Sequence, residues 1–189
     1  MQRGSGSCVT ATFTSGYSRE ALVRERAQQM GRNPDELVAR MQALPQDLVR
    51  AYFETSYSVH VQAGECVLRI PEPVPAAINE LLEARQAASW TIITAVNPYS
   101  QPVSAEENTR RSELLAELLT LHRLQTFPAT GKSDCGGWEE ESLCVLGLTY
   151  NMAQALGSAF QQNAVLYGEK DAVVELIFCA QRPASRVSR

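Results

Sequence analysis

The chain has 189 residues, of which 44% are hydrophobic and 20% are charged, a mixture typical of a globular protein rather than a disordered one. Its formal net charge of -4 argues against broad, non-specific binding to nucleic acids, because such binding requires an excess of basic residues. No apolar run approaches the roughly 18 residues that a membrane-spanning helix needs, so no membrane partner is expected.

Five cysteines are present, and none forms a CxxC pair. Three lie in apolar segments, where a reduced thiol behaves as a small hydrophobic group: Cys66, Cys144 and Cys179. The two histidines, His60 and His122, are far apart in the sequence, so no metal site is expected. No nucleotide motif such as GxGxxG occurs, and no cofactor is expected. The first 13 residues lack the apolar core of a signal peptide, so a cytoplasmic protein is predicted.

The first 45 residues are predicted to form an N-terminal extension built on a helical hairpin. Residues 1–16 are rich in Gly, Ser and Thr and are expected to be either a loose terminus or one short strand. Ser18 is positioned to begin a helix that Gly31 ends, and Asn33 is a good N-cap for a second helix. The extension is expected to pack on the main domain or on a second copy of it.

Residues 46–181 are predicted to form a single α/β domain. A third helix is followed by strand, strand, helix, strand, helix, strand, strand, helix, strand and strand. Ser104, with Glu107 three residues later, and Thr149 are expected to begin two of these helices. This interleaving predicts a mixed sheet of about five or six strands with helices packed on it, and it leaves an α+β arrangement open. Residues 182–189 carry no apolar pattern and are predicted to be a frayed tail.

Polar clusters lie where these predicted elements begin or end. Asn97 follows the buried strand WTIITAV, and ligands of open α/β sheets bind beyond the carboxyl ends of strands. Asn108 lies with Glu107 and two arginines in the first turn of the next helix, a position that attracts anions. An ordinary turn at Asn97 and simple helix capping at Glu107 are the alternatives.

Two further clusters lie on either side of the following helix. Strand alternation places Glu140 and Ser142 on one side of a strand, where a carboxylate would act as a general base or bind an amine. Gln162 and Asn163 connect a helix to a strand, and their amides can bind a polar ligand or satisfy the end of the helix. A solvated acidic edge is the alternative for Glu140.

In this order, the clusters resemble a bacterial family known as domain of unknown function 3293. The resemblance covers roughly Leu48 to Cys179, and Val96, Glu139 and Glu141 depart from the family's pattern. It implies a compact α/β domain with a shared polar cluster and no particular reaction. The segments that carry it are AYFETSY at 51–57, TAVNPYS at 94–100, EN at 107–108, Trp138 with Glu140 and Ser142, VLGL at 145–148 and QNAV at 162–165.

The leading hypothesis is that six polar side chains converge on one pocket for a small polar ligand, nucleoside-like or amino-acid-like. They are Asn97, Asn108, Glu140, Ser142, Gln162 and Asn163. Glu140 would be the catalytic base if a reaction takes place, and whether the protein is an enzyme is left open.

Two alternatives use other parts of the chain. The first is a non-catalytic module that binds a protein partner or itself through the N-terminal helices or a sheet edge. The second is a regulator similar to ribbon-helix-helix proteins, with the strand at VTATFT. That strand lacks the basic residues that would read base edges, so nucleic acid is not an expected partner.

Overall fold

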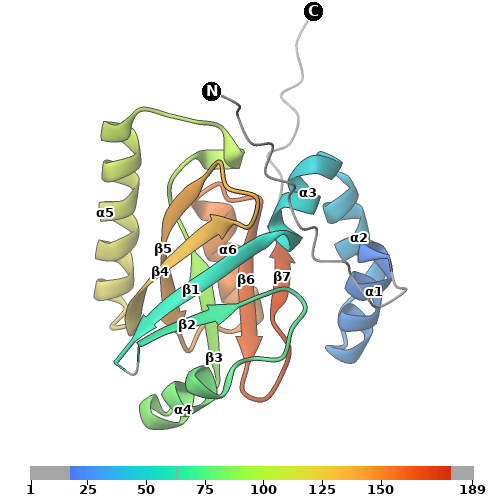
Figure 1. The fold of residues 1–189 in the computed structure, drawn as a ribbon, viewed down its shortest axis with the longest axis horizontal. Coiled ribbons are helices and arrows are strands. Elements are labelled where there is room, and N and C mark those ends of the chain that lie inside the picture. The colour runs from blue at the N-terminus through green and yellow to red at the C-terminus, as the bar shows by residue number, and fades with distance from the viewer. Residues whose placement is uncertain (1–17, 63, 180–189) are drawn as a thin grey trace, which may run out of the picture.

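The computed structural model describes residues 18–62 and 64–179 (Figure 1). The short strand considered within residues 1–16 and the tail at 182–189 lie outside these residues. The helices are α1 (Arg19–Gln29), α2 (Pro34–Gln42), α3 (Gln46–Phe53), α4 (Ala76–Arg85), α5 (Ala105–Leu121) and α6 (Tyr150–Ala159), with a 3-10 turn η1 (Pro98–Ser100). The strands are β1 (Thr55–Val61), β2 (Gly64–Leu68), β3 (Ser89–Ile93), β4 (Thr126–Ser133), β5 (Glu139–Leu146), β6 (Ala164–Glu169) and β7 (Glu175–Phe178).

The expected α/β class, with helices packed on a single sheet, is confirmed, but the sheet differs in detail from the prediction. It has seven strands in the order β2-β1-β4-β5-β3-β6-β7, and every pair is antiparallel, which corrects the mixed sheet of five or six strands. The reason lies in the crossovers. The connection through α5 joins β3 to β4 and the connection through α6 joins β5 to β6, and each passes over one strand that lies between the pair. The strand passed over runs antiparallel to both.

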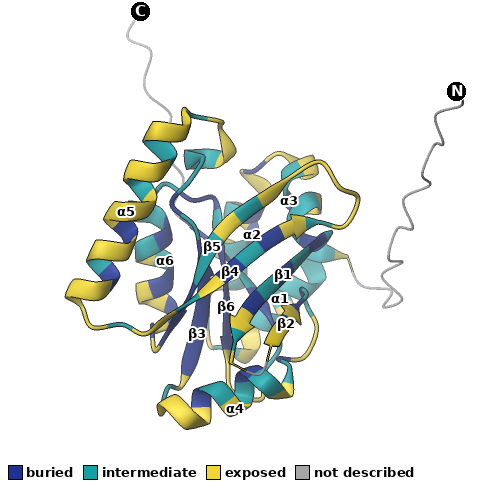
Figure 2. Ribbon diagram, turned by 60° about the vertical axis from the view of Figure 1, so that its left-hand side comes forward, coloured by how far each residue is buried: buried dark blue, intermediate teal, exposed yellow. Residues whose placement is uncertain are grey.

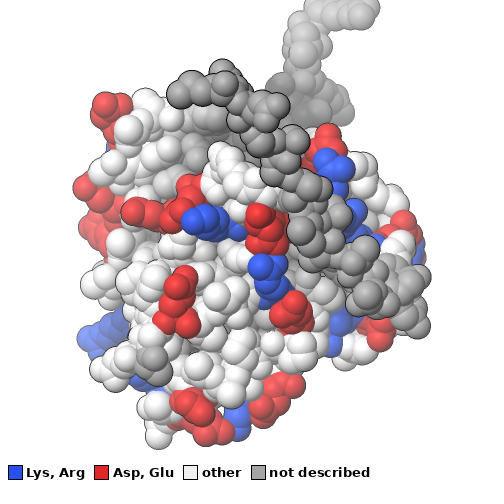
Figure 3. All heavy atoms as spheres, in the orientation of Figure 1, with Lys and Arg blue, Asp and Glu red and all other residues white. Residues whose placement is uncertain are grey.

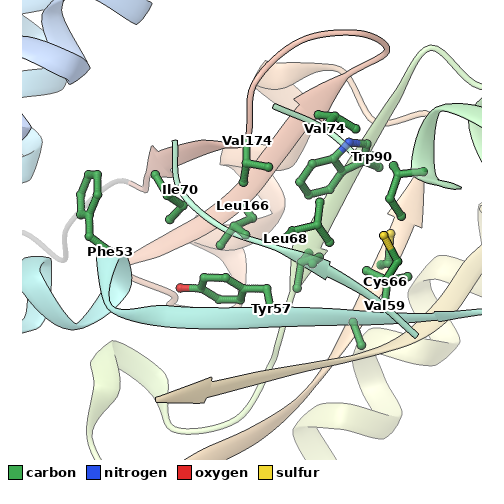
Figure 4. Packing of buried hydrophobic residues seen from close by; sticks show 14 of the residues in the cluster. Phe53, Tyr57, Val59, Cys66, Leu68, Ile70, Val74, Trp90, Leu166 and Val174 are labelled. Carbon is green, nitrogen blue, oxygen red and sulfur yellow. The ribbon is translucent and has the colours of Figure 1, made fainter. Parts of the chain in front are cut away.

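The sheet separates two apolar cores (Figures 1 and 2). One core lies inside the curl of the sheet, where side chains from β1, β2, β3 and β6 point toward one another (Figure 4). Trp90 and Val59 are completely buried in it. The other core joins the opposite face to α5 through Leu115 and to α6 through Ala153. At the second interface Gly157 lets α6 approach closely, since a Cβ there would collide with Cys179 Sγ.

Helix starts follow the predicted capping residues. The side chains of Ser18, Asn33, Ser104 and Thr149 each accept a hydrogen bond from a backbone N–H in the first turn of the helix that follows. The hydroxyl of Ser104, for example, lies 3.2 Å from the amide nitrogen of Glu107. Each cap satisfies an amide that the helix itself leaves without a partner.

The N-terminal helices contribute to the core inside the sheet. Met41, in the last turn of α2, and Leu44, just after the helix, are each 5% exposed and pack in the same cluster as Trp90 and Leu166. The division of the chain at residue 45 stays a prediction. Cys66, Cys144 and Cys179 are free and buried, as expected from their apolar neighbours. No helix among the described residues is long and apolar enough to span a membrane.

Candidate functional site

A cavity of about 290 Å³ lies beyond the end of β3, bounded by α3 and by the first half of β5. Four of the six predicted site residues line it: Asn97, Glu140, Ser142 and Gln162. Asn108 and Asn163 are not in its wall, and each bonds to a side chain that is. The structure therefore brings together groups that are up to 66 residues apart in the sequence.

The cavity exists because β3 stops short of its neighbour. Ile93 pairs with Leu143, so the preceding part of β5, residues 139–142, has β4 on one side and the irregular segment 94–97 on the other. Since the neighbours of β3 are antiparallel to it, its carboxyl end lies beside the amino ends of β5 and β6. The cavity therefore lies beyond the carboxyl end of β3, as expected. The rule that suggested this position concerns parallel strands, however, and this sheet is antiparallel.

Asn97 connects helix α5 to the carboxylate of Glu140. Its Nδ2 donates to Glu140 Oε1 at 3.1 Å, and its Oδ1 accepts from Asn108 Nδ2 at 3.1 Å. Asn108 Oδ1 in turn accepts from the backbone N–H of Asn97 at 2.9 Å. This reciprocal pair fixes the Asn97 amide, so its N–H group is directed at the carboxylate.

Glu140 is a half-buried carboxylate without a cationic partner among the described residues. Burial raises the pKa of its side chain above the ordinary value of 4.5, and the hydrogen bond from Asn97 opposes that rise. The described residues that line the cavity include no Lys, Arg or His. The carboxylate therefore faces a space where no positive protein charge compensates it.

Gln162 and Asn163 hold the segment after β3 in place. Gln162 Nε2 donates to the carbonyl of Val96 at 3.0 Å, and Asn163 Nδ2 donates to Ser100 Oγ at 2.9 Å. Both residues are buried, and Gln162 also borders the cavity. The alternative from the sequence was that these amides only satisfy the end of the preceding helix. Instead, each amide also donates to the segment after β3.

Arg111 is a supporting residue that the sequence hypothesis did not include in the site. Its Nε donates to the carbonyl of Ala95 at 2.6 Å, and its second terminal nitrogen donates to the carbonyl of Phe160 at 2.5 Å. The neighbouring Arg110 pairs instead with Glu107 at the surface. Arg111 thus ties α5 to the segment after β3 and to the end of α6, a role that only the folded chain reveals.

Three residues in this segment have left-handed backbone conformations: Asn97 (φ 48°), Tyr99 (φ 54°) and Ser100 (φ 57°). Asn tolerates this region, but a bulky residue such as Tyr99 pays a conformational cost there. The amide of Tyr99 donates to the carbonyl of Gln161 at 2.7 Å, which helps to hold the conformation. Such strain concentrates at functional sites, where the surroundings enforce it.

Aromatic side chains complete the wall of the cavity. Tyr52 and Tyr57 come from α3 and β1, and Trp138 precedes β5. A Cβ placed on Gly131 would lie 3.5 Å from both the Tyr57 ring and the Trp138 ring, so the two rings meet over this glycine. Trp138 was predicted as part of a cluster. Tyr52 and Tyr57 were missed, because their spacing is that of ordinary core residues.

A second cavity of about 500 Å³ lies on the other face of the sheet, between α5 and strands β4 and β5. Thr94 and Ser142 border both cavities. His60 borders the second cavity and does not line the first. Among residues 18–62 and 64–179, no group of three or more His, Cys, Asp or Glu side chains is arranged to hold a metal ion.

Comparison with known proteins supports the resemblance seen in the sequence. Residues 93–165 match a family described as "Protein of unknown function (DUF3293)". The predicted family resemblance is confirmed. The matched segment runs from the end of β3 to the start of β6, so it contains all six predicted site residues. No curated protein and no solved structure matches the chain.

Proposed function

We propose that the protein binds a small polar ligand in the cavity beside Glu140. The observation that carries the proposal is the Glu140 carboxylate, which is half-buried, held by Asn97 and without a cationic partner among the described residues. Burying a carboxylate is costly unless hydrogen-bond donors or a positive charge compensate it. A ligand that supplies such donors would lower this cost when it binds.

The carboxylate has capacity left for a ligand. An ionised carboxylate offers about four lone-pair sites, and Asn97 is the one described side chain that donates to Glu140. The volume of about 290 Å³ lies at the lower end of small-molecule sites. A nucleoside-like or amino-acid-like molecule fits this size better than a dinucleotide cofactor does. If the ligand reacts, Glu140 is the group placed to act as general base, since a raised pKa makes a carboxylate a stronger base.

The alternatives have less support. Large exposed hydrophobic side chains among the described residues are scattered over β2, α5, α6 and the loop before β5, which does not favour an apolar docking patch. On the face seen in Figure 3, acidic and basic side chains are interspersed, and the described residues form no continuous basic patch there. We also propose a cytoplasmic location; the free thiols of Cys66, Cys144 and Cys179 support it, whereas the disulfide bond of Cys135 does not.

The test compares wild type with Glu140→Gln. We expect the wild-type protein to retain a small molecule through purification, detectable by mass spectrometry of the extracted ligand, and the variant to lose it. Glu141→Gln is the matched control, because Glu141 is the next residue, is exposed and alternates to the opposite face of β5.

Both outcomes are informative. An equal amount of ligand in Glu140→Gln and Glu141→Gln would contradict the proposal. A large fall in the melting temperature of Glu140→Gln alone would show that Glu140 has a structural role instead.

A further inference from the structure

The charge of the cavity restricts the ligand further, on the basis of the proposed function. Its described lining residues include Glu139 and Glu140 and no basic side chain. Arg111, which holds the segment after β3, already donates to the carbonyls of Ala95 and Phe160. Glu139 is exposed and pairs with Lys132, whereas Glu140 has no cationic partner among the described residues. A ligand with a phosphate or carboxylate would place its negative charge near the Glu140 carboxylate, and like charges in a partly buried site repel.

The shape of the cavity favours a flat ring. The Tyr57 and Trp138 rings both lie against Gly131, where a Cβ would be 3.5 Å from each of them. Trp138 is 41% exposed, so much of its ring is open to a ligand. Apolar side chains of Ile92, Leu166 and Leu176 form other parts of the lining. Aromatic and apolar walls of this kind bind planar heterocycles by stacking and burial.

The polar groups define the edge of that ring. Glu140 accepts from Asn97 through one oxygen, and the remaining lone pairs of the carboxylate are suited to two adjacent N–H donors. Ser142 lies two residues further on the same side of β5 and offers a hydroxyl. A ring with two neighbouring N–H groups on one edge matches this arrangement, as does the Watson–Crick edge of guanine.

We propose that the ligand is an unphosphorylated, guanine-type base or nucleoside, stacked against Trp138 and Tyr57 with its N–H edge on Glu140. Adenine presents a ring-nitrogen acceptor where guanine presents a donor, and that acceptor would face the carboxylate. The 5′-phosphate of a nucleotide would meet no cation in the described lining.

Isothermal titration of the full chain with four probes tests this assignment. Guanosine is expected to bind, whereas inosine, which lacks the exocyclic amine, and adenosine are each expected to bind at least about tenfold more weakly, because a site built to accept N–H groups rejects analogues without them. Guanosine 5′-monophosphate is expected to lose at least about tenfold as well.

Variants at the aromatic wall add a second readout. Trp138→Leu is expected to weaken guanosine binding by about tenfold, and Trp138→Phe to keep most of it, because stacking requires a ring. If a variant folds poorly, the four titrations of the wild-type protein still test whether the ligand is of the guanine type.

The two proposals fail in different ways. This inference would be overturned if guanosine 5′-monophosphate or adenosine bound as tightly as guanosine. It would also be overturned if the extracted ligand depended on Glu140 but had no flat ring. Either result would leave the proposed function standing. No binding of any small molecule that depends on Glu140 would overturn both.

Discussion

At the scale of single residues, the charge of Glu140 is the feature with the clearest consequences. Its carboxylate is partly removed from water, and Asn97 compensates the charge only in part. Glu175, an acid that is more deeply buried, differs because it pairs with Arg26. The contrast suggests that Glu140 is placed for an interaction with a molecule outside the chain.

The raised pKa of Glu140 predicts a particular dependence of stability on pH. Because the folded state holds the proton more tightly than the unfolded state, the stability that this residue contributes is complete below its ordinary value of 4.5 and is lost as the pH rises through the folded pKa. Glu140→Gln cannot ionise, so its free energy of unfolding should increase relative to wild type between about pH 4 and about pH 7.

Urea unfolding of both ligand-free proteins across that range measures the difference. Glu141→Gln, at an exposed position, controls for the loss of one negative charge. A difference between Glu140→Gln and wild type that stays constant with pH would show that the carboxylate is not desolvated.

The sequence predicted the polar residues of the candidate site better than its walls. Asn97, Glu140 and Gln162 stood out because they lie where predicted strands and helices begin or end, the positions at which ligands of sheet proteins bind. Tyr52 and Tyr57 did not, since an aromatic residue at core spacing has the same pattern whether it faces other side chains or a cavity. Which side it faces depends on how α3 and β1 pack, and local periodicity does not encode that.

At the scale of elements, the segment between β3 and α5 is held by its neighbours rather than by its own sequence. Arg111, whose side chain is 13% exposed, donates to two backbone carbonyls from different elements. Hydrogen bonds from a charged group contribute more than neutral ones, and an unsatisfied buried carbonyl is costly. The position of Asn97, and therefore of the Glu140 carboxylate, depends on this connection.

Substitutions of Arg111 and of its neighbour Arg110 should affect stability differently. We expect Arg111→Ala to lower the free energy of unfolding by about 2–4 kcal/mol, because two charge-assisted hydrogen bonds are lost. Arg110→Ala removes an exposed ion pair with Glu107 and should change the free energy of unfolding far less than Arg111→Ala does, because exposed ion pairs contribute little. Denaturation followed by circular dichroism compares them, and equal losses would contradict the assigned role of Arg111.

The elements themselves were largely predictable, but their pairing was not. Ser18, Asn33, Ser104 and Thr149 begin helices as expected, since capping depends on residues a few positions apart. Strand order depends on contacts between distant segments. The alternation of strands and helices suggested neighbouring parallel strands, whereas each long crossover leaves room for an antiparallel strand between the two that it joins.

At the scale of the whole molecule, the N-terminal helices and the sheet share one apolar core. Met41 on α2 packs in the same cluster as Trp90 at the centre of the sheet. Burial of this kind couples the stability of the two parts, because opening either one exposes the same apolar surface. The chain should therefore unfold in one step.

Met41→Ala tests this coupling. The loss of a buried side chain should lower the free energy of unfolding by about 2–5 kcal/mol, and the Trp90 fluorescence transition should shift together with the helical circular dichroism signal. A Trp138→Phe background leaves Trp90 as the single tryptophan. Met152→Ala, at a residue that is 49% exposed on α6, should change stability by less than about 0.5 kcal/mol. A fluorescence transition unmoved by Met41→Ala would show that the extension folds separately.

The left-handed run at Asn97, Tyr99 and Ser100 has a consequence for recognition. Its shape is imposed by Arg111, Gln162 and Asn163, none of which needs a guest molecule to make its bonds. The donors and acceptors around Glu140 are thus preorganised, and the entropic cost of arranging them is met when the chain folds rather than when a partner arrives. Association should then proceed close to lock-and-key, with little backbone rearrangement.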